Sequence, residues 1–115
     1  MSEGAKRLEG WLIQIGIMPN LTGFTYIKES VEICCDFSGE RIKTSQIYKI
    51  LAKRYEKTSC AIERNIRHAI QVASNSNKII RLNNVVGQSV LGGLDKPSAS
   101  LLISLLAQKH KSMCM

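Results

Sequence analysis

Residues 60–71 carry closely spaced side chains that can recognise phosphates or the edges of bases. On a helical wheel of about 100° per residue, the polar members of this set fall on one side. That side holds Cys60, Arg64, Arg67, His68 and Gln71, with Ala61 at its edge. Arginine can bind guanine through two hydrogen bonds and glutamine can read adenine, and either can hold a phosphate instead. We interpret this face as a candidate DNA-binding surface.

Glu63 lies on the flank of this face, four residues before Arg67. Its carboxylate can accept a hydrogen bond from the amino group of cytosine, or it can orient Arg67 one helical turn away. The opposite arc of the helix is apolar and consists of Ile62, Ile66, Ala69, Ile70 and Ala73. The alternative interpretation is that the polar face is only the solvated side of a core helix.

Catalytic and metal sites find less support in the same residues. His68 would need a nucleophile and an orienting carboxylate to act as a base, and Glu63 lies on a different part of the wheel. A phosphate contact therefore suits His68 better. No two of the four cysteines have the C-x-x-C spacing of a metal or redox site. These are Cys34, Cys35, Cys60 and Cys114. We expect free thiols of a reducing cytoplasm, no metal and no cofactor.

The whole chain has a formal net charge of +7, and its positive charge is concentrated in the middle third. Residues 41–81 hold ten basic side chains against Glu56 and Glu63, a net charge of +8, and the remainder carries −1. The basic ones are Arg41, Lys43, Lys49, Lys53, Arg54, Lys57, Arg64, Arg67, Lys78 and Arg81. Such a segment within a folded domain indicates a polyanionic partner.

Length and composition restrict the elements that can position this face. The 115 residues suffice for one domain, 1–115, and 44% apolar residues supply one core. No apolar run approaches the roughly 18 to 20 residues of a membrane span, and the polar start of the chain lacks a signal-peptide pattern. Two prolines and 5% aromatic residues favour helices. We expect a cytoplasmic all-α protein that neither spans a membrane nor forms a multidomain enzyme.

Apolar residues recur at intervals of three and four, which predicts a compact bundle of about six helices. The expected helices are 2–15, 23–35, 44–55, 58–74, a short one within 79–87, and one from 97 or 98 to about 109. A loop is expected at 36–40 and irregular structure at 88–96. Thr44 or Ser45 is expected to cap the third helix. The last helix has a broad apolar face for the core or for self-association, formed by Leu101, Leu102, Leu105 and Leu106.

The third and fourth helices together have the layout of a helix-turn-helix over about 44–74. Ala52 supplies the small residue where the second helix of this motif crosses the first. Apolar residues can hold the two helices together, namely Leu51, Tyr55, Ile62 and Ile66. The turn contains Glu56-Lys57, whereas the motif usually prefers glycine there for its left-handed backbone.

The string E-R-N-I-R-H-A-I, from Glu63 to Ile70, resembles the recognition helix in the effector-domain family of stage zero sporulation protein A, the response regulator of endospore formation. The family pattern is close to S-R-V-E-R-x-I-R-H-A-I-E-V-A-W. The resemblance extends over most of the chain. Further matching stretches are Ile15-Gly-Ile, Gly23-Phe-Thr-Tyr-Ile-Lys-Glu, Leu51-Ala-Lys-Arg-Tyr, Gly87 and Lys96-Pro97.

This resemblance implies a six-helix domain whose fourth helix enters the major groove of double-stranded DNA. It implies base contacts at the positions of Glu63 and Arg64, and phosphate contacts at those of Arg67 and His68. It further implies that copies bind tandem sites. A contact with the sigma subunit of RNA polymerase, through the region before the last helix, is implied as well.

Several positions depart from the family pattern. Ala61 stands where the family has an arginine that reads bases, Cys60 replaces its serine, and Asn65 replaces its alanine. Ser74 replaces the tryptophan after V-A. Either the target sequence is therefore expected to differ, or the affinity is expected to be lower. No receiver domain with a phosphorylatable aspartate is present in these residues, and the start at Met1 favours a stand-alone relative over a fragment.

Together these observations predict a sequence-specific DNA-binding transcription regulator. Base contacts are assigned to Cys60, Ala61, Glu63, Arg64 and Asn65. Phosphate contacts are assigned to Lys57, Ser59, Arg67, His68 and Gln71. The alternative is a protein-interaction module of the same fold, which sequesters a regulator or RNA polymerase without reading DNA; the loss of arginine at position 61 favours it. No set of residues supports an enzyme.

Overall fold

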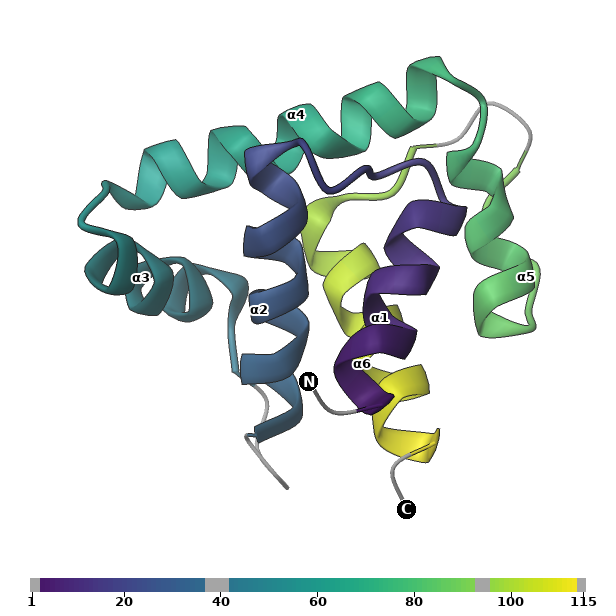
Figure 1. Ribbon diagram of the computed structural model, residues 1–115, viewed down its shortest axis with the longest axis horizontal. Helices are drawn as coiled ribbons and strands as arrows, with labels where there is room; N and C mark the ends of the chain where they lie inside the picture. The colour runs from purple at the N-terminus through teal and green to yellow at the C-terminus, as the bar shows by residue number, and fades with distance from the viewer. Residues whose placement is uncertain (1–2, 37–41, 93–95, 114–115) are drawn as a thin grey trace.

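The computed structural model describes residues 3–36, 42–92 and 96–113 and is built from helices (Figure 1). They are α1 (Glu3–Gln14), α2 (Thr22–Asp36), α3 (Thr44–Tyr55), α4 (Ser59–Asn75), the 3₁₀ turn η1 (Ile79–Arg81), α5 (Leu82–Val86) and α6 (Ala99–Met113). Within these ranges there is no β-strand, so the predicted all-α bundle of about six helices is confirmed. Arg41, Cys114 and most of the expected loop at 36–40 lie outside the described residues.

The arrangement places α4 across one end of the other long helices (Figure 1). α2 is the central element, since it packs against α4, α6 and α3. Lys28 of α2 also joins α1 through an ion pair of 2.8 Å with Glu9, and this hydrogen bond raises the pKa of Lys28. None of the described helices is long and apolar enough to cross a membrane.

The core is formed by the apolar faces that the helical periodicity indicates. Leu8, Leu12 and Ile15 are buried at α1, and Tyr26, Ile27 and Val31 are buried in α2. In α6 the expected face needs a correction, because Leu101 is exposed. The buried face of that helix is Leu102, Ile103, Leu106 and Ala107. It is therefore turned by about one residue from the leucine-only face that the sequence suggests.

The start of α3 also differs from the prediction. Neither Thr44 nor Ser45 caps the helix, because the N-cap residue is Lys43. The side chain of Gln46 reaches back to this position, and its Oε1 accepts a hydrogen bond of 2.9 Å from the Lys43 backbone N–H. A glutamine three residues into the helix thus satisfies a backbone donor at its start.

The turn between α3 and α4 adopts the left-handed backbone that usually favours glycine. Glu56 has φ 54° and ψ 46°. The backbone N–H of Lys57 then donates to the carbonyl of Ala52 at 2.9 Å, which closes the end of α3. The chain re-enters helix after Thr58, whose Oγ1 accepts from the Ala61 N–H at 3.0 Å. This three-residue connection sets the direction in which α4 leaves α3.

The C-terminal helix is longer than expected. It begins at Ala99, where Ser98 Oγ accepts a hydrogen bond of 3.1 Å from the Leu101 N–H, and it continues to Met113. The basic side chains near Lys109 therefore do not mark its end. They still lie close to its last turn, where cations interact favourably with the helix dipole.

Candidate nucleic-acid interface

The buried face of α4 is fixed by a close crossing with α2. Ile62, Ile66 and Ala69 are fully buried. At the first turn of α2, Gly23 lies so near α4 that an added Cβ atom would come within 2.3 Å of the Asn65 carbonyl oxygen. The same atom would lie 2.7 Å from the Ala69 Cβ. Only glycine allows the two backbones to approach this closely, and the rotation of α4 about its axis is thereby set.

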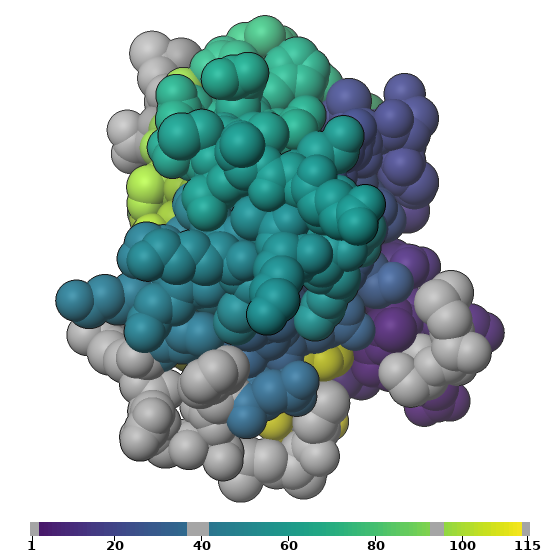
Figure 2. Space-filling view, turned by 90° about the vertical axis from the view of Figure 1, so that its left-hand side faces the viewer, coloured from purple at the N-terminus to yellow at the C-terminus, as the bar shows by residue number. Residues whose placement is uncertain are grey.

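The opposite face of α4 is turned outward, as the helical wheel predicts. Cys60, Arg64, Arg67 and His68 are exposed, and Glu63 and Gln71 are half-buried. Figure 2 shows the surface of α4 above that of α3, together forming the central part of this side of the molecule. The ten residues assigned to DNA contact all lie on α4 or in the turn before it, so the fold presents them together.

Within this face Glu63 and Arg67 form an ion pair one helical turn apart. This matches the orienting role expected of Glu63. Both side chains are largely in solvent, where such a pair contributes at most about 1 kcal/mol to stability. The pair therefore orients the Arg67 guanidinium and can exchange it for a phosphate at little cost.

Asn65 is held differently from its neighbours. Its side-chain Nδ2 donates to the Ala61 carbonyl at 2.9 Å, and its own carbonyl is the atom closest to Gly23 of α2. The residue is half-buried between the outer face and the crossing. This bond uses one of the two Nδ2 hydrogens, so the other hydrogen and Oδ1 remain for a base contact.

Gln71 lies in a chain of polar contacts that no local sequence pattern predicts. Its Oε1 accepts a hydrogen bond of 2.7 Å from Nζ of Lys96, a residue that precedes α6. Its Nε2 donates to Oδ1 of Asn75 at 2.7 Å. Lys96 is thus a cation on this surface that was not among the predicted contacts. The 25 residues that separate it from Gln71 leave no local pattern that could have revealed the pair.

Tyr48 of α3 is buried close enough to Glu63 and Arg67 for both charges to act on it. Burial raises the pKa of Tyr48 to about 12; the negative charge of Glu63 adds to this shift and the positive charge of Arg67 opposes it. Only 8% of Tyr48 is exposed, so this residue belongs to the buried side of α3 although it was not among the predicted core residues.

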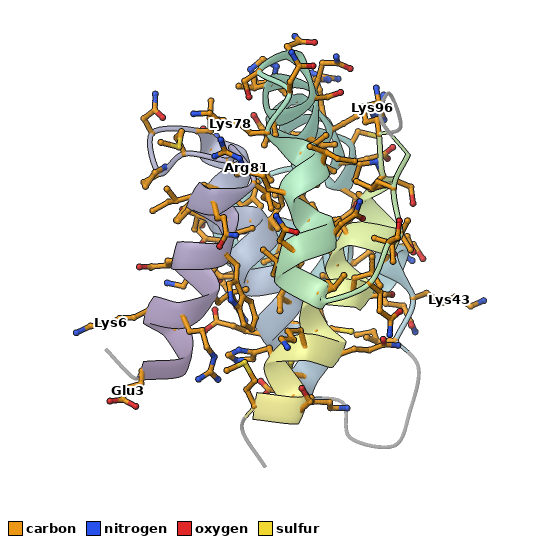
Figure 3. All side chains as sticks on the ribbon, turned by 90° about the vertical axis from the view of Figure 1, so that its right-hand side faces the viewer. Glu3, Lys6, Lys43, Lys78, Arg81 and Lys96 are labelled. Carbon is orange, nitrogen blue, oxygen red and sulfur yellow. The ribbon has the colours of Figure 1, made fainter. Side chains whose placement is uncertain are left out.

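The remaining basic side chains of residues 41–81 have two kinds of surroundings: some are exposed, and Arg54 forms an ion pair within the fold. Arg54 pairs with Glu29 of α2, and the Tyr55 hydroxyl donates to the same carboxylate, so Arg54 helps to attach α3 to α2. Lys53 and Lys57 are exposed beside the turn. Figure 3 shows further cations around the far end of α4, with Lys78 and Arg81 on one side and Lys96 on the other.

The outer face of α4 thus has side chains that can donate hydrogen bonds to bases near its beginning, and positively charged side chains lie at both of its ends. A comparison with protein families agrees with this picture: the family described as "Sporulation initiation factor Spo0A C terminal" matches residues 8–110 of the 115 residues.

Proposed function

Since this chain belongs to the Spo0A C-terminal family, we propose that it is a sequence-specific DNA-binding regulator of transcription. In this proposal α3 and α4 act as a helix-turn-helix, with the first turns of α4 in the major groove of duplex DNA. The observation that carries the proposal is the outward face of α4, which is held by the Gly23 crossing and bears Arg64, Arg67 and His68.

The position of each side chain along α4 supports its proposed role. Arg64 is exposed one turn from the helix start, where recognition helices usually contact base edges. Glu63 and Asn65 flank it, and Cys60 and Ala61 lie one turn earlier on the same surface. Lys57 and Ser59 precede them at the turn, whereas Arg67, His68 and Gln71 follow. The residues that would read bases are Cys60, Ala61, Glu63, Arg64 and Asn65. Those that would hold phosphates are Lys57, Ser59, Arg67, His68 and Gln71.

Arg64→Ala tests base reading directly. The variant is expected to lose about 1 to 3 kcal/mol of binding free energy on its specific site and much less on random DNA. Ala61→Arg restores the family's arginine and is expected to tighten binding to the operator of the sporulation family. Competition binding at one fixed salt concentration measures both effects.

The control is Lys6→Ala, because Lys6 lies in α1 far from α4 (Figure 3). It removes a positive charge without touching the proposed surface. If the unaltered protein shows no preference among DNA sequences, and neither Arg64→Ala nor Ala61→Arg changes that, specific reading is absent. A protein-interaction module that sequesters a partner regulator would then be the better account of the same fold.

A further inference from the structure

Lys96 contacts the outer face of α4 from a segment outside the helix-turn-helix. It lies 25 residues beyond Gln71 in sequence, yet its ammonium group donates to the Gln71 side chain at 2.7 Å. We propose that Lys96, oriented by Gln71, contacts a DNA phosphate at the rim of the major groove. This inference rests on the proposed function and names an additional residue of that same interface.

The segment before Lys96 is anchored to the body of the domain. Asn83 of α5 accepts hydrogen bonds of 2.9 Å from the backbone N–H groups of both Val90 and Leu91. Its Nδ2 donates to the Leu91 carbonyl at 3.0 Å. Leu91 itself is in the core. One side chain thus fixes the backbone at Val90 and Leu91, upstream of Lys96.

The residue after Lys96 is held as well. Pro97 is buried, although its neighbours Lys96 and Ser98 are exposed. Ser98 in turn caps α6. The base of the Lys96 side chain is therefore fixed between a buried proline and the surface of α4. A cation with a fixed base loses less conformational entropy on contact with a phosphate than one on a free loop.

The position of Lys96 along α4 matches the edge of the groove. Gln71 comes seven residues after Arg64, which is about 10 Å at 1.5 Å per residue. The major groove is about 12 Å wide. With Arg64 over the bases, the level of Gln71 and Lys96 is close to one of the phosphate walls. The 17 residues of α4 span about 25 Å, so its last turns extend beyond that wall.

Charge distinguishes Lys96 from two arginines of the basic segment, Arg54 and Arg67. Arg67 pairs with Glu63 and Arg54 pairs with Glu29, so each shares its charge with a carboxylate. Gln71 is a neutral amide, and its hydrogen bond orients the Lys96 ammonium group without cancelling the charge. Neutralisation of a phosphate by such a group releases a counterion, which makes the contact visible in the salt dependence of binding.

The test compares Lys96→Ala, Lys96→Arg and the control Lys6→Ala on one specific DNA duplex. Lys96→Ala is expected to reduce the slope of log affinity against log salt by about 0.9, the value for one phosphate contact on duplex DNA. Lys96→Arg keeps the charge and should retain the slope of the unaltered protein. Lys6→Ala should retain it too. Equal slopes for Lys96→Ala and the unaltered protein would overturn the contact while leaving the proposed function intact.

A double-mutant cycle tests the role of Gln71. If Gln71 acts by orienting Lys96, then Gln71→Ala weakens binding when Lys96 is present and has little further effect in the Lys96→Ala background. Additive losses would show that Gln71 holds a phosphate by itself, as in the contact assigned to it above, and would overturn its positioning role. Absence of any salt-dependent DNA binding by the unaltered protein is a separate result, which would overturn the proposed function itself.

Discussion

The inner and outer faces of α4 are held in different ways. On the inner face, buried isoleucines pack into the core, and the crossing with α2 leaves no room for one added carbon atom. The outer face carries polar side chains, several of which contact one another. The inner contacts tolerate almost no displacement. Outside, the Glu63–Arg67 pair and the Lys96–Gln71–Asn75 chain consist of exchangeable hydrogen bonds. The helix is therefore placed by its apolar contacts, and its polar contacts remain available to a ligand.

This difference predicts that substitutions on the two faces have separate consequences. Changes on the inner face should lower the free energy of unfolding, and with it every activity of the surface. Changes on the outer face should alter DNA binding and leave stability within about 0.5 kcal/mol.

The largest effect is expected from Ile66→Ala. Ile66 is fully buried, and emptying such a site costs about 2 to 5 kcal/mol of unfolding free energy. Urea denaturation followed by circular dichroism measures the loss. Arg64→Ala is the matched outer-face control and should unfold at nearly the same urea concentration as the unaltered protein. If Ile66→Ala were as stable as the unaltered protein, this face of α4 would not form the core.

Gly23→Ala should have the next largest effect. The added methyl group would meet the Asn65 carbonyl and the Ala69 side chain, so α2 and α4 would have to separate, at a cost of about 1 to 3 kcal/mol. Gly10→Ala is a sharp control, because nothing lies within 4 Å of an added Cβ there. Alanine in the α1 helix should stabilise the protein by up to about 1 kcal/mol. Thermal denaturation should thus shift in opposite directions for the two glycine variants; a shift in the same direction would contradict the close crossing.

Arg67→Ala addresses the outer face alone. Removal of one phosphate-binding cation should lower affinity for all DNA sequences alike and reduce the log–log salt slope by about one unit. The melting temperature should change little, because the ion pair with Glu63 is exposed. Fluorescence anisotropy at several salt concentrations measures the slope, and an unchanged slope would remove Arg67 from the phosphate contacts.

The smallest effect concerns the buried Tyr48 of α3, and it appears only at alkaline pH. The folded protein holds the Tyr48 proton up to a pKa of about 12, whereas an unfolded tyrosine loses it near the ordinary tyrosine pKa of 10.0. Between these values the folded state binds more protons than the unfolded state, so stability should fall as pH rises. Tyr48→Phe should show a smaller fall in unfolding free energy between pH 9 and pH 11. An identical fall in both proteins would mean that Tyr48 does not titrate in this way.

Local patterns in the sequence predicted the features that depend on neighbouring residues. The spacing of Ile62, Ile66 and Ala69 identified the buried face of α4, and Thr58 marked its start to within one residue. The Glu63–Arg67 pair followed from a spacing of four. Each of these features is decided within one or two helical turns, where periodicity and capping act.

Features that join distant segments were not predicted from the sequence. The contact of Lys96 with Gln71 depends on the course of the chain after α5, and the Gly23 crossing depends on how two helices meet. The cap of α3 was missed for a different reason. Thr44 and Ser45 are favourable cap residues, but the reach of Gln46 back to Lys43 moves the helix start one residue earlier. The cap is thus decided by a side chain three residues further along the chain, and not by the capping preference of Thr44 or Ser45 alone.

The packing of α6 on α2 also has a consequence for the order in which the protein is made. The ribosome releases α3 and α4 before α6, yet the core is completed by Leu102 and Leu106 of α6. α2, which positions α4 at Gly23, packs against α6 along its other side. A growing chain that has already released its basic segment therefore lacks the support that orients it. We therefore expect α4 to reach its final position only after α6 has left the exit tunnel and the domain folds as a unit.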